Sequence, residues 1–246
     1  GVTFQMEASG LVADFQGGRF LLQDWVSVHI LHELVVQHSY YWAPLGTPLL
    51  IFDIGMNIGF SALMLAIREP SALVIGFEPF RSTFDVMQRN LALNPGLASR
   101  ITAYQYGLSD RDAQEEWTLS VDDASISGQF LEKGPGDQES TPVTLRAASA
   151  VMGPLREAHP HRGCMVKMDC EGGEYAILKD WAGSGFLKHI DLLAMEYHEI
   201  GGHRLEELES CLIRNGFTAI VQPAKSTGKP SPFGFIYAFP RRGAGG

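Results

Sequence analysis

The segment LLIFDIGMNIG, from Leu49 to Gly59, constrains the fold more than any other part of the chain. Leu49 to Ile54 is a near-continuous apolar run of the kind that a parallel strand buried on both faces requires. Gly55 and Gly59 then allow a tight turn with close backbone approach, and apolar residues at helical spacing follow at once. A strand, a glycine-containing turn and a helix in this order predict the start of a nucleotide-binding βαβ unit.

The rest of the chain continues to alternate between helix and strand patterns. Apolar residues at helical spacing predict helices over Ile58 to Ile67, Phe80 to Leu93 and Arg204 to Arg214. Apolar runs predict strands over Leu73 to Phe77, Ile101 to Tyr106, Cys164 to Met168, Ile190 to Glu196, Phe217 to Val221 and Phe233 to Phe239. This alternation implies an α/β fold with right-handed crossovers, a mostly parallel sheet and helices on both faces.

The remaining segments set the expected domain limits. Residues 1–48 are expected to form a helical extension, with a helix over Gln23 to Ser39 that packs on the main domain, residues 49–240. Inside that domain, Gly107 to Asp110 is expected to be a turn, and the polar segment from Asp110 to Pro142 to hold a hairpin around Trp117 and a mobile loop near Lys133 to Ser140. Residues 241–246 are expected to be a disordered tail.

Composition excludes several classes of partner. The chain has 246 residues, 45% of them hydrophobic, yet no apolar run approaches the ~20 residues needed to cross a bilayer. A formal net charge of −9 argues against a broad nucleic-acid surface, which needs clustered Lys and Arg. Three cysteines without CxxC spacing fit a reducing compartment. With no signal-peptide pattern after Gly1, we expect a cytoplasmic protein that binds neither membrane nor nucleic acid.

Two carboxylates predict the class of cofactor. Asp53 ends the first strand, and Glu78 ends the second, where its side chain can accept hydrogen bonds from both ribose hydroxyls of an adenosine cofactor. Asn57 and Phe60 stand where the dinucleotide fingerprint GxGxxG requires glycines, which disfavours a nicotinamide dehydrogenase. S-adenosylmethionine (SAM) carries a sulfonium cation and no pyrophosphate, so an acidic, polar turn suits it. We therefore expect Asp53, Gly55, Asn57, Gly59 and Glu78 to bind SAM.

A second acidic cluster predicts the catalytic side chains. Asp169, Glu171 and Glu174 follow the fourth strand, and Glu196 and His198 leave the fifth strand at the same sheet edge. His198 is the candidate general base, because its unperturbed pKa lies nearest neutrality. Asp169 is the alternative base, and Glu171 is a further catalytic candidate.

Other roles remain open for this cluster. Lys167, inside the strand, is expected to pair with a carboxylate. Glu174 could instead favour a helix dipole. The set Asp169, Glu171, Glu196 and His198 could hold Mg²⁺, although no metal site is assigned.

Four strings together resemble the FkbM family of SAM-dependent methyltransferases. They are FDIGMNIGF, the FEPF string followed by Asn90 and Asn94, the LSD of Leu108 to Asp110, and VKMDCEGGEYAIL from Val166 to Leu178, whose KxDxEGxE element is the most distinctive. The resemblance covers about Leu49 to Tyr197, with Met56 in place of the usual small residue. Residues 1–48 carry no family signal.

The resemblance implies a fold and site roles. The fold implied is the Rossmann-like class I methyltransferase sheet of seven strands, with the last strand antiparallel. Asp53, Gly55, Asn57 and Gly59 would surround the methionyl part of SAM, and Glu78 would hold the ribose. Ser109 and Asp110 would border the adenine, and Asp169 would lie beside the cofactor.

The activity implied is methylation of a hydroxyl on a sugar or secondary metabolite, with S-adenosylhomocysteine (SAH) as product. The partner is then a small-molecule acceptor. Two alternatives stay open: methylation of a carboxylate or nitrogen on a peptide or small molecule, and a catalytically silent SAM-fold module that binds a partner. An intact DIGMNIG turn and Glu78 argue against the silent module, which has no need of a cofactor site.

Overall fold

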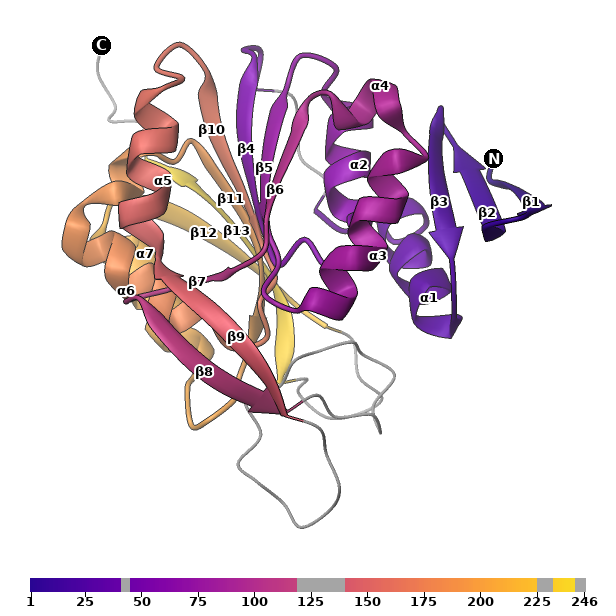
Figure 1. Ribbon diagram of the computed structural model, residues 1–246. Helices are drawn as coiled ribbons and strands as arrows, with labels where there is room; N and C mark the ends of the chain where they lie inside the picture. Colours follow the sequence, from indigo (N-terminus) through magenta and orange to yellow (C-terminus); the bar gives the residue numbers. More distant parts are fainter. Residues whose placement is uncertain (41–44, 119–139, 225–231, 242–246) are drawn as a thin grey trace.

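The computed structural model describes residues 1–40, 45–118, 140–224 and 232–241 (Figure 1). Among these residues a seven-stranded sheet forms the centre of the molecule, in the order β12-β13-β11-β10-β4-β5-β6. Its strands are β4 (Leu49–Ile54), β5 (Leu73–Phe77), β6 (Ile101–Tyr104), β10 (Gly163–Met168), β11 (Leu192–His198), β12 (Phe217–Pro223) and β13 (Phe233–Pro240).

The sheet is parallel except for β13, which runs antiparallel to both β11 and β12. Nine residues separate Pro223 from Phe233, fewer than the dozen or more that a crossover between parallel neighbours needs. The returning strand therefore runs antiparallel. This confirms the expected α/β class, with its seven-stranded sheet and antiparallel last strand.

Helices cover both faces of the sheet (Figure 1). One face carries α2 (Phe60–Arg68), α3 (Arg81–Ala92) and α4 (Pro95–Ala98), and the other carries α5 (Ala148–Glu157), α6 (Glu174–Ser184), the 3₁₀ turn η1 (Phe186–His189) and α7 (Leu205–Arg214). Alternate residues of each strand enter opposite cores, so Leu50 and Phe52 of β4 pack toward α6 while Leu49 and Ile51 pack toward α2. That two-sided burial explains the continuous apolar runs in the sequence.

A smaller sheet lies at the carboxyl edge of the large one. It consists of β7 (Gly107–Ser109), β9 (Ser140–Ala147) and β8 (Ala113–Thr118), in that order. The expected hairpin around Trp117 is confirmed as the antiparallel pair β8 and β9. The expected turn over Gly107 to Asp110 is wrong, because residues 107–109 pair in parallel with Leu145–Ala147. Of the expected loop from Lys133 to Ser140, all but the last residue lies outside the described residues.

The N-terminal extension differs from the purely helical segment that we expected. An antiparallel meander of β1 (Thr3–Glu7), β2 (Gly10–Phe15) and β3 (Gly18–Leu22) precedes the helix α1 (Trp25–Val35). α1 begins where Asp24 accepts a hydrogen bond from the backbone N–H of Ser27, which closes a capping box. Strand β3 and helix α1 both pack on the core around α2.

Two asparagines, Asn90 within α3 and Asn94 just after it, attach this extension to the main domain. Asn90, fully buried, accepts a hydrogen bond from the backbone N–H of Leu21 at 2.8 Å and donates one to the carbonyl of Ile58 at 2.9 Å. Asn94 accepts from the N–H of Arg19 and donates to its carbonyl. Both asparagines therefore act as bridges between β3 and the βαβ unit.

Three further findings bear on the sequence predictions. Among the described residues, no helix is long and apolar enough to span a membrane. Cys164, Cys170 and Cys211 carry free thiols. Arg241 belongs to the ordered structure, since its side chain donates hydrogen bonds to the carbonyls of Phe217 and Ile213, while residues 242–246 of the expected tail lie outside the described residues.

Replacing Asn90 by Ala is expected to lower the free energy of unfolding by about 2–4 kcal/mol, because it leaves the N–H of Leu21 and the carbonyl of Ile58 buried without partners. Urea unfolding would measure the change. Gln88→Ala, an exposed site on the same helix, is the control and should stay within about 0.5 kcal/mol of wild type. Equal stability of the two variants would contradict the bridging role.

Candidate active site

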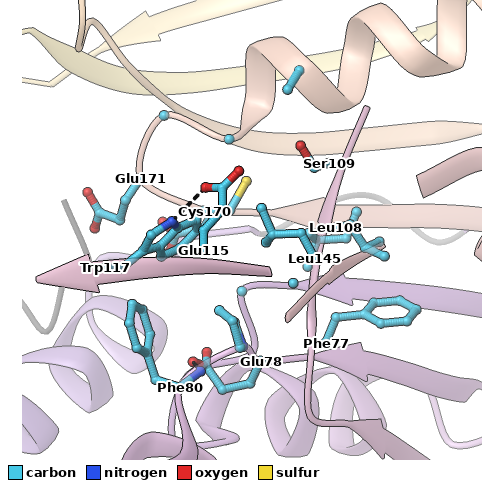
Figure 2. Close-up of a pocket in the computed structure, with 18 of the residues that line it drawn as sticks. Phe77, Glu78, Phe80, Leu108, Ser109, Glu115, Trp117, Leu145, Cys170 and Glu171 are labelled. Atoms are coloured by element: carbon cyan, nitrogen blue, oxygen red, sulfur yellow. Dashed lines mark hydrogen bonds between the residues drawn. The ribbon is translucent and has the colours of Figure 1, made fainter. Parts of the chain in front are cut away.

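A cavity of about 380 Å³ opens beyond the carboxyl ends of β4, β5 and β10 (Figure 2). In open parallel sheets this edge, beside the turn after the first strand, is where ligands bind. Six residues predicted from the sequence line it: Gly55, Asn57, Glu78, Ser109, Asp169 and Glu171. Residues from chain segments more than 100 positions apart thus meet in one hollow.

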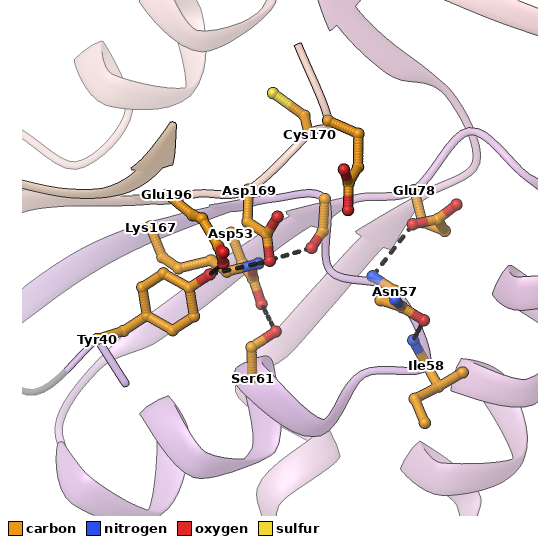
Figure 3. Close-up of polar contacts among 12 residues, drawn as sticks. Tyr40, Asp53, Asn57, Ile58, Ser61, Glu78, Lys167, Asp169, Cys170 and Glu196 are labelled. Atoms are coloured by element: carbon orange, nitrogen blue, oxygen red, sulfur yellow. Dashed lines mark hydrogen bonds and ion pairs between the residues drawn. The ribbon is translucent and has the colours of Figure 1, made fainter. Parts of the chain in front are cut away.

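Glu78 is held in place by the backbone. It is 4% exposed, and its two carboxylate oxygens accept hydrogen bonds from the N–H of Asn57 at 3.1 Å and the N–H of Phe80 at 2.9 Å (Figure 3). Burial raises the pKa of Glu78 to about 7, against the two backbone hydrogen bonds, which lower it. The side chain is therefore an oriented acceptor whose charge depends on pH near neutrality.

The turn after β4 needs glycine at position 55. Gly55 has φ +73°, and a Cβ there would lie 1.7 Å from the carbonyl oxygen of Asp169. The turns from β4 and β10 can therefore touch only when one of them has no side chain. Asn57 and Glu171, which line the cavity beside this contact, also have positive φ values, 49° and 50°. Such left-handed residues collect at ligand sites, where the surrounding structure holds them.

Beneath the turn lies a buried ion pair. Asp53 is fully buried, with one oxygen 3.3 Å from the ammonium of Lys167 and the other accepting a hydrogen bond from Ser61 at 2.6 Å. Lys167 also donates a hydrogen bond to the carbonyl of Gly55 at 2.7 Å. The predicted pairing of Lys167 with a carboxylate is confirmed.

Four of the predicted site residues do not line the large cavity. Asp53 lies behind the turn, and Gly59 begins α2 as its N-cap. Asp110 pairs with Lys179 at 3.0 Å and with Arg111 at 3.1 Å, beside the cavity wall. His198 lies deeper, 9% exposed, behind the acidic cluster. Asp53 and Gly59 thus shape the turn from behind.

His198 is surrounded by carboxylates. Its Nδ1 lies 3.1 Å from Glu174, which is fully buried, and its Nε2 lies 3.4 Å from Glu171. Burial alone would lower the pKa of His198, but the hydrogen bond and charge of Glu174, with the charges of Glu171 and Asp169, raise it to about 10. The surrounding carboxylates therefore favour the imidazolium form of His198, in which both ring nitrogens are donors.

Asp169 and Glu196 converge from neighbouring strands, as the sequence predicted. A side chain that the sequence analysis missed joins them: the hydroxyl of Tyr40 lies 2.9 Å from Asp169 and 3.1 Å from Glu196 (Figure 3). Candidate ligand atoms of Asp169, Glu196 and His198 all lie within 4.8 Å of one another. Nothing in the pattern of residues 1–48 marked Tyr40, because its partners lie 129 and 156 positions away.

An aromatic wall closes the cavity on the side of the small sheet (Figure 2). Trp117 of β8 lies with its ring centroid 5.6 Å from that of Phe80, and its indole N–H donates a hydrogen bond to Glu115 at 2.9 Å. Leu145 of β9 completes this wall. The sequence indicated a hairpin at Trp117, but its position over the cavity follows from the pairing of β7 with β9.

Replacing Lys167 by Ala is expected to lower the free energy of unfolding by about 3–5 kcal/mol, because the charge of Asp53 would remain buried without its partner. Thermal or urea unfolding would measure the loss. Lys188→Ala, at an exposed lysine, serves as the control. The double variant Asp53→Asn/Lys167→Met should recover part of the loss, and a double variant less stable than Lys167→Ala would contradict the pairing.

Comparison with known proteins identifies the family. Residues 53–218 match the family profile described as "Methyltransferase FkbM domain". The chain is 41% identical over 177 residues to methyltransferase sdnD of Sordaria araneosa, an alignment that covers 61% of this chain and 67% of that protein. It is 34% identical over 171 residues to methyltransferase 1 of Beauveria bassiana, covering 63% of this chain and 67% of that protein.

A solved structure supports the same fold. Methyltransferase FkbM of Methylobacillus flagellatus superimposes with a TM-score of 0.53 at 19% identity and covers 85% of this chain. The chain spans 47% of the length of that protein. The FkbM resemblance is thereby confirmed: with a profile match over more than half of its length, the chain belongs to the FkbM-domain family of methyltransferases.

Proposed function

We propose that this methyltransferase binds SAM in the 380 Å³ cavity and transfers its methyl group to a hydroxyl of a sugar or secondary metabolite. The observation that carries the proposal is Glu78, whose carboxylate faces the cavity in an orientation fixed by two backbone N–H donors. A carboxylate in this place can accept hydrogen bonds from both hydroxyls of a ribose. SAM and SAH both carry that ribose.

The charge of the site supports a cationic cofactor. Asp169 and Glu171 line the cavity, and Glu174 and Glu196 lie directly behind them, while Lys167 and His198 supply the cationic groups among them. Burial first, and then the charges of Asp169 and Glu174, raises the pKa of Glu171 to about 7. A sulfonium beside Asp169 would lower the electrostatic cost of ionising the cluster.

Methyl transfer does not require the protein to form a covalent bond with the cofactor or the acceptor. The acceptor oxygen attacks the methyl carbon in line with sulfur, the C–S bond breaks as the O–C bond forms, and SAH leaves; alignment and exclusion of water supply most of the rate. The acceptor proton needs a base. Asp169, which lines the cavity, fits that role better than His198, which is already protonated at neutral pH.

A resident metal ion is not part of this proposal. The ammonium of Lys167 lies 3.7 Å from Asp169 and supplies positive charge where Mg²⁺ would otherwise be needed. Turnover is therefore expected to survive chelation. Activity lost with chelator and restored by Mg²⁺ would instead assign Asp169, Glu196 and His198 to a metal site.

Two other functions remain distinguishable from hydroxyl methylation. Methylation of a carboxylate or nitrogen on a peptide or small molecule would use the same cofactor site without a demand for Asp169 as base. A silent interaction module would bind neither SAM nor SAH tightly. The net charge of −9 supports a small-molecule acceptor over a nucleic acid. Mass spectrometry of a metabolite panel incubated with methyl-labelled SAM identifies the acceptor and the atom methylated.

Calorimetry should show binding of SAM and SAH and none of NAD. Replacing Glu78 by Gln is expected to weaken SAH binding about 10- to 100-fold, since charge-assisted hydrogen bonds to the ribose are lost. Glu206→Gln, an exposed glutamate, is the matched control and should bind like wild type. Unchanged affinity in Glu78→Gln would remove Glu78 from the cofactor site, and binding of NAD alone would overturn the SAM assignment.

Cofactor affinity should also depend on pH through Glu78. Ribose hydroxyls donate to the ionised carboxylate, and the pKa of Glu78, raised by burial to about 7, means that it becomes protonated as pH falls through 7. We expect SAH affinity to be highest above pH 8 and to decline below pH 7 by up to about tenfold per pH unit. In Glu78→Gln, the slope of the logarithm of SAH affinity against pH should be smaller by up to one proton. An identical slope in both proteins would contradict the assignment.

A further inference from the structure

A second, smaller cavity of about 60 Å³ lies between α1 and the carboxyl edge of the sheet. It shares Gly55, Asn57 and Asp169 with the large cavity, so Asp169 stands where the two meet. Its other polar walls include Tyr40 and Glu196. The N-terminal extension thus supplies one wall of a chamber that adjoins the proposed methyl donor.

Tyr40 is held in this wall by its surroundings. It is 6% exposed, its ring packs edge-on against Phe235 with centroids 5.5 Å apart, and the ammonium of Lys167 lies 5.1 Å from the ring centroid. Its backbone has φ +57°, a left-handed conformation that is uncommon for a tyrosine. A residue kept in that conformation is fixed by the contacts around it, which here include two carboxylates.

The two contacts of the Tyr40 hydroxyl bear on the protonation of Asp169 and Glu196. Its hydroxyl lies 2.9 Å from an oxygen of Asp169 and 3.1 Å from an oxygen of Glu196, but it has one proton to donate. One carboxylate can accept that proton, and the other then makes its hydrogen bond by donating a proton to the tyrosine oxygen. A proton held on one of the two carboxylates would satisfy both contacts and reduce the repulsion between them.

Charges nearby decide which carboxylate holds the proton. Asp169 has the ammonium of Lys167 at 3.7 Å, whereas Glu196 has the imidazole of His198 at 4.0 Å and also faces the charge of Asp169. Burial first, and then the charge of Asp169, raises the pKa of Glu196 to about 8. The titratable groups around Glu196 are Glu33 of α1, Tyr40, Lys167 and Asp169 of β10 and its turn, Glu171, His198 of β11 and Tyr237 of β13.

We propose that Tyr40 of the N-terminal extension is a positioning residue that links Glu196 and Asp169 into one proton-sharing chain, which discharges when SAM binds. In the resting site, a protonated Glu196 would donate to the Tyr40 oxygen across the 3.1 Å contact, and the Tyr40 hydroxyl would donate to Asp169 across the 2.9 Å contact. Arrival of the sulfonium drives the Glu196 proton to solvent, toward which the Glu196 side chain is 18% exposed.

This chain prepares Asp169 for the proposed reaction, on which the inference rests. When the acceptor hydroxyl is methylated, its proton passes to Asp169. That proton then moves to the Tyr40 oxygen as the Tyr40 hydroxyl proton moves to Glu196, so that the chain regains its resting proton. Tyr40 lies outside residues 53–218, the part that matches the family profile, so the extension would contribute to the reaction of this chain directly.

Proton release can be measured without an acceptor. Calorimetry of SAM and of SAH at pH 7, repeated in buffers of different ionisation enthalpy, gives the number of protons released per ligand. A neighbouring cation lowers a carboxyl pKa by about 1–2 units, so wild type should release roughly 0.4–0.8 protons more with SAM than with SAH. SAH lacks the sulfonium charge and should leave Glu196 protonated.

Three variants make the test specific. Glu196→Gln should remove more than half of the difference between SAM and SAH, because it removes the Glu196 proton; the remainder comes from Glu171, whose pKa burial raises to about 7. Tyr40→Phe should reduce the difference to less than half, because protonated Glu196 loses its acceptor, while SAH affinity stays within twofold of wild type. Tyr106→Phe is the matched control; Tyr106 packs on Phe77 and Tyr104, away from the acidic cluster, and should behave as wild type.

The outcomes separate the inference from the proposed function. Binding of SAM and SAH with equal proton release in wild type overturns the proton-sharing chain and leaves the cofactor assignment intact. A wild-type difference that persists in Tyr40→Phe, or falls equally in Tyr106→Phe, overturns the role of Tyr40. Absence of binding of either ligand overturns the proposed function and the chain with it.

Discussion

The ion pair of Lys167 with Asp53 is the interaction on which the site depends. An ammonium buried at the junction of β4 and β10 must be compensated, and it finds Asp53, Asp169 and the carbonyl of Gly55 within reach. These contacts tie the turn after β4 to the turn after β10. Because both turns line the large cavity, the shape of the proposed cofactor site follows from how this one charge is satisfied.

From that pair outward, the carboxylates change from fully buried to partly exposed at the cavity walls. Asp53 is fully buried and paired with Lys167, Asp169 borders both cavities, and Glu171 lies at the wall of the larger one. Burial first, and then the charges of neighbouring carboxylates, raises the pKa of Glu171 to about 7 and that of Glu196 to about 8, which favours retention of protons near neutral pH. Such a cluster can receive positive charge, which the sulfonium of the proposed cofactor would provide.

Much of the fold was predictable because its signals are local. A strand buried on both faces shows as a continuous apolar run, so β4 and β5 were located to within a residue or two. β7 was misassigned as a turn, since three residues acquire strand structure only by pairing with Leu145–Ala147, 38 positions away. The meander β1 to β3 was missed for a related reason: its apolar residues Phe20 and Leu22 are buried against α2, and its backbone is held by Asn90 and Asn94, partners that come much later in the chain.

The sequence by itself indicated the family, through the resemblance of its motifs, and it located the strands and the carboxylates that follow them, because a buried strand and the residues after it form a local pattern. Tertiary structure decided what each carboxylate does. Asp53 and Glu78 end adjacent strands, yet Asp53 is sealed beneath the turn by Lys167 while Glu78 faces the cavity. Tyr40, which contacts the acidic cluster, belongs to an extension without family signal. The carboxylates around His198 raise its pKa and favour the imidazolium form. Burial and the sum of neighbouring charges set these roles, and both exist only once distant segments have packed together.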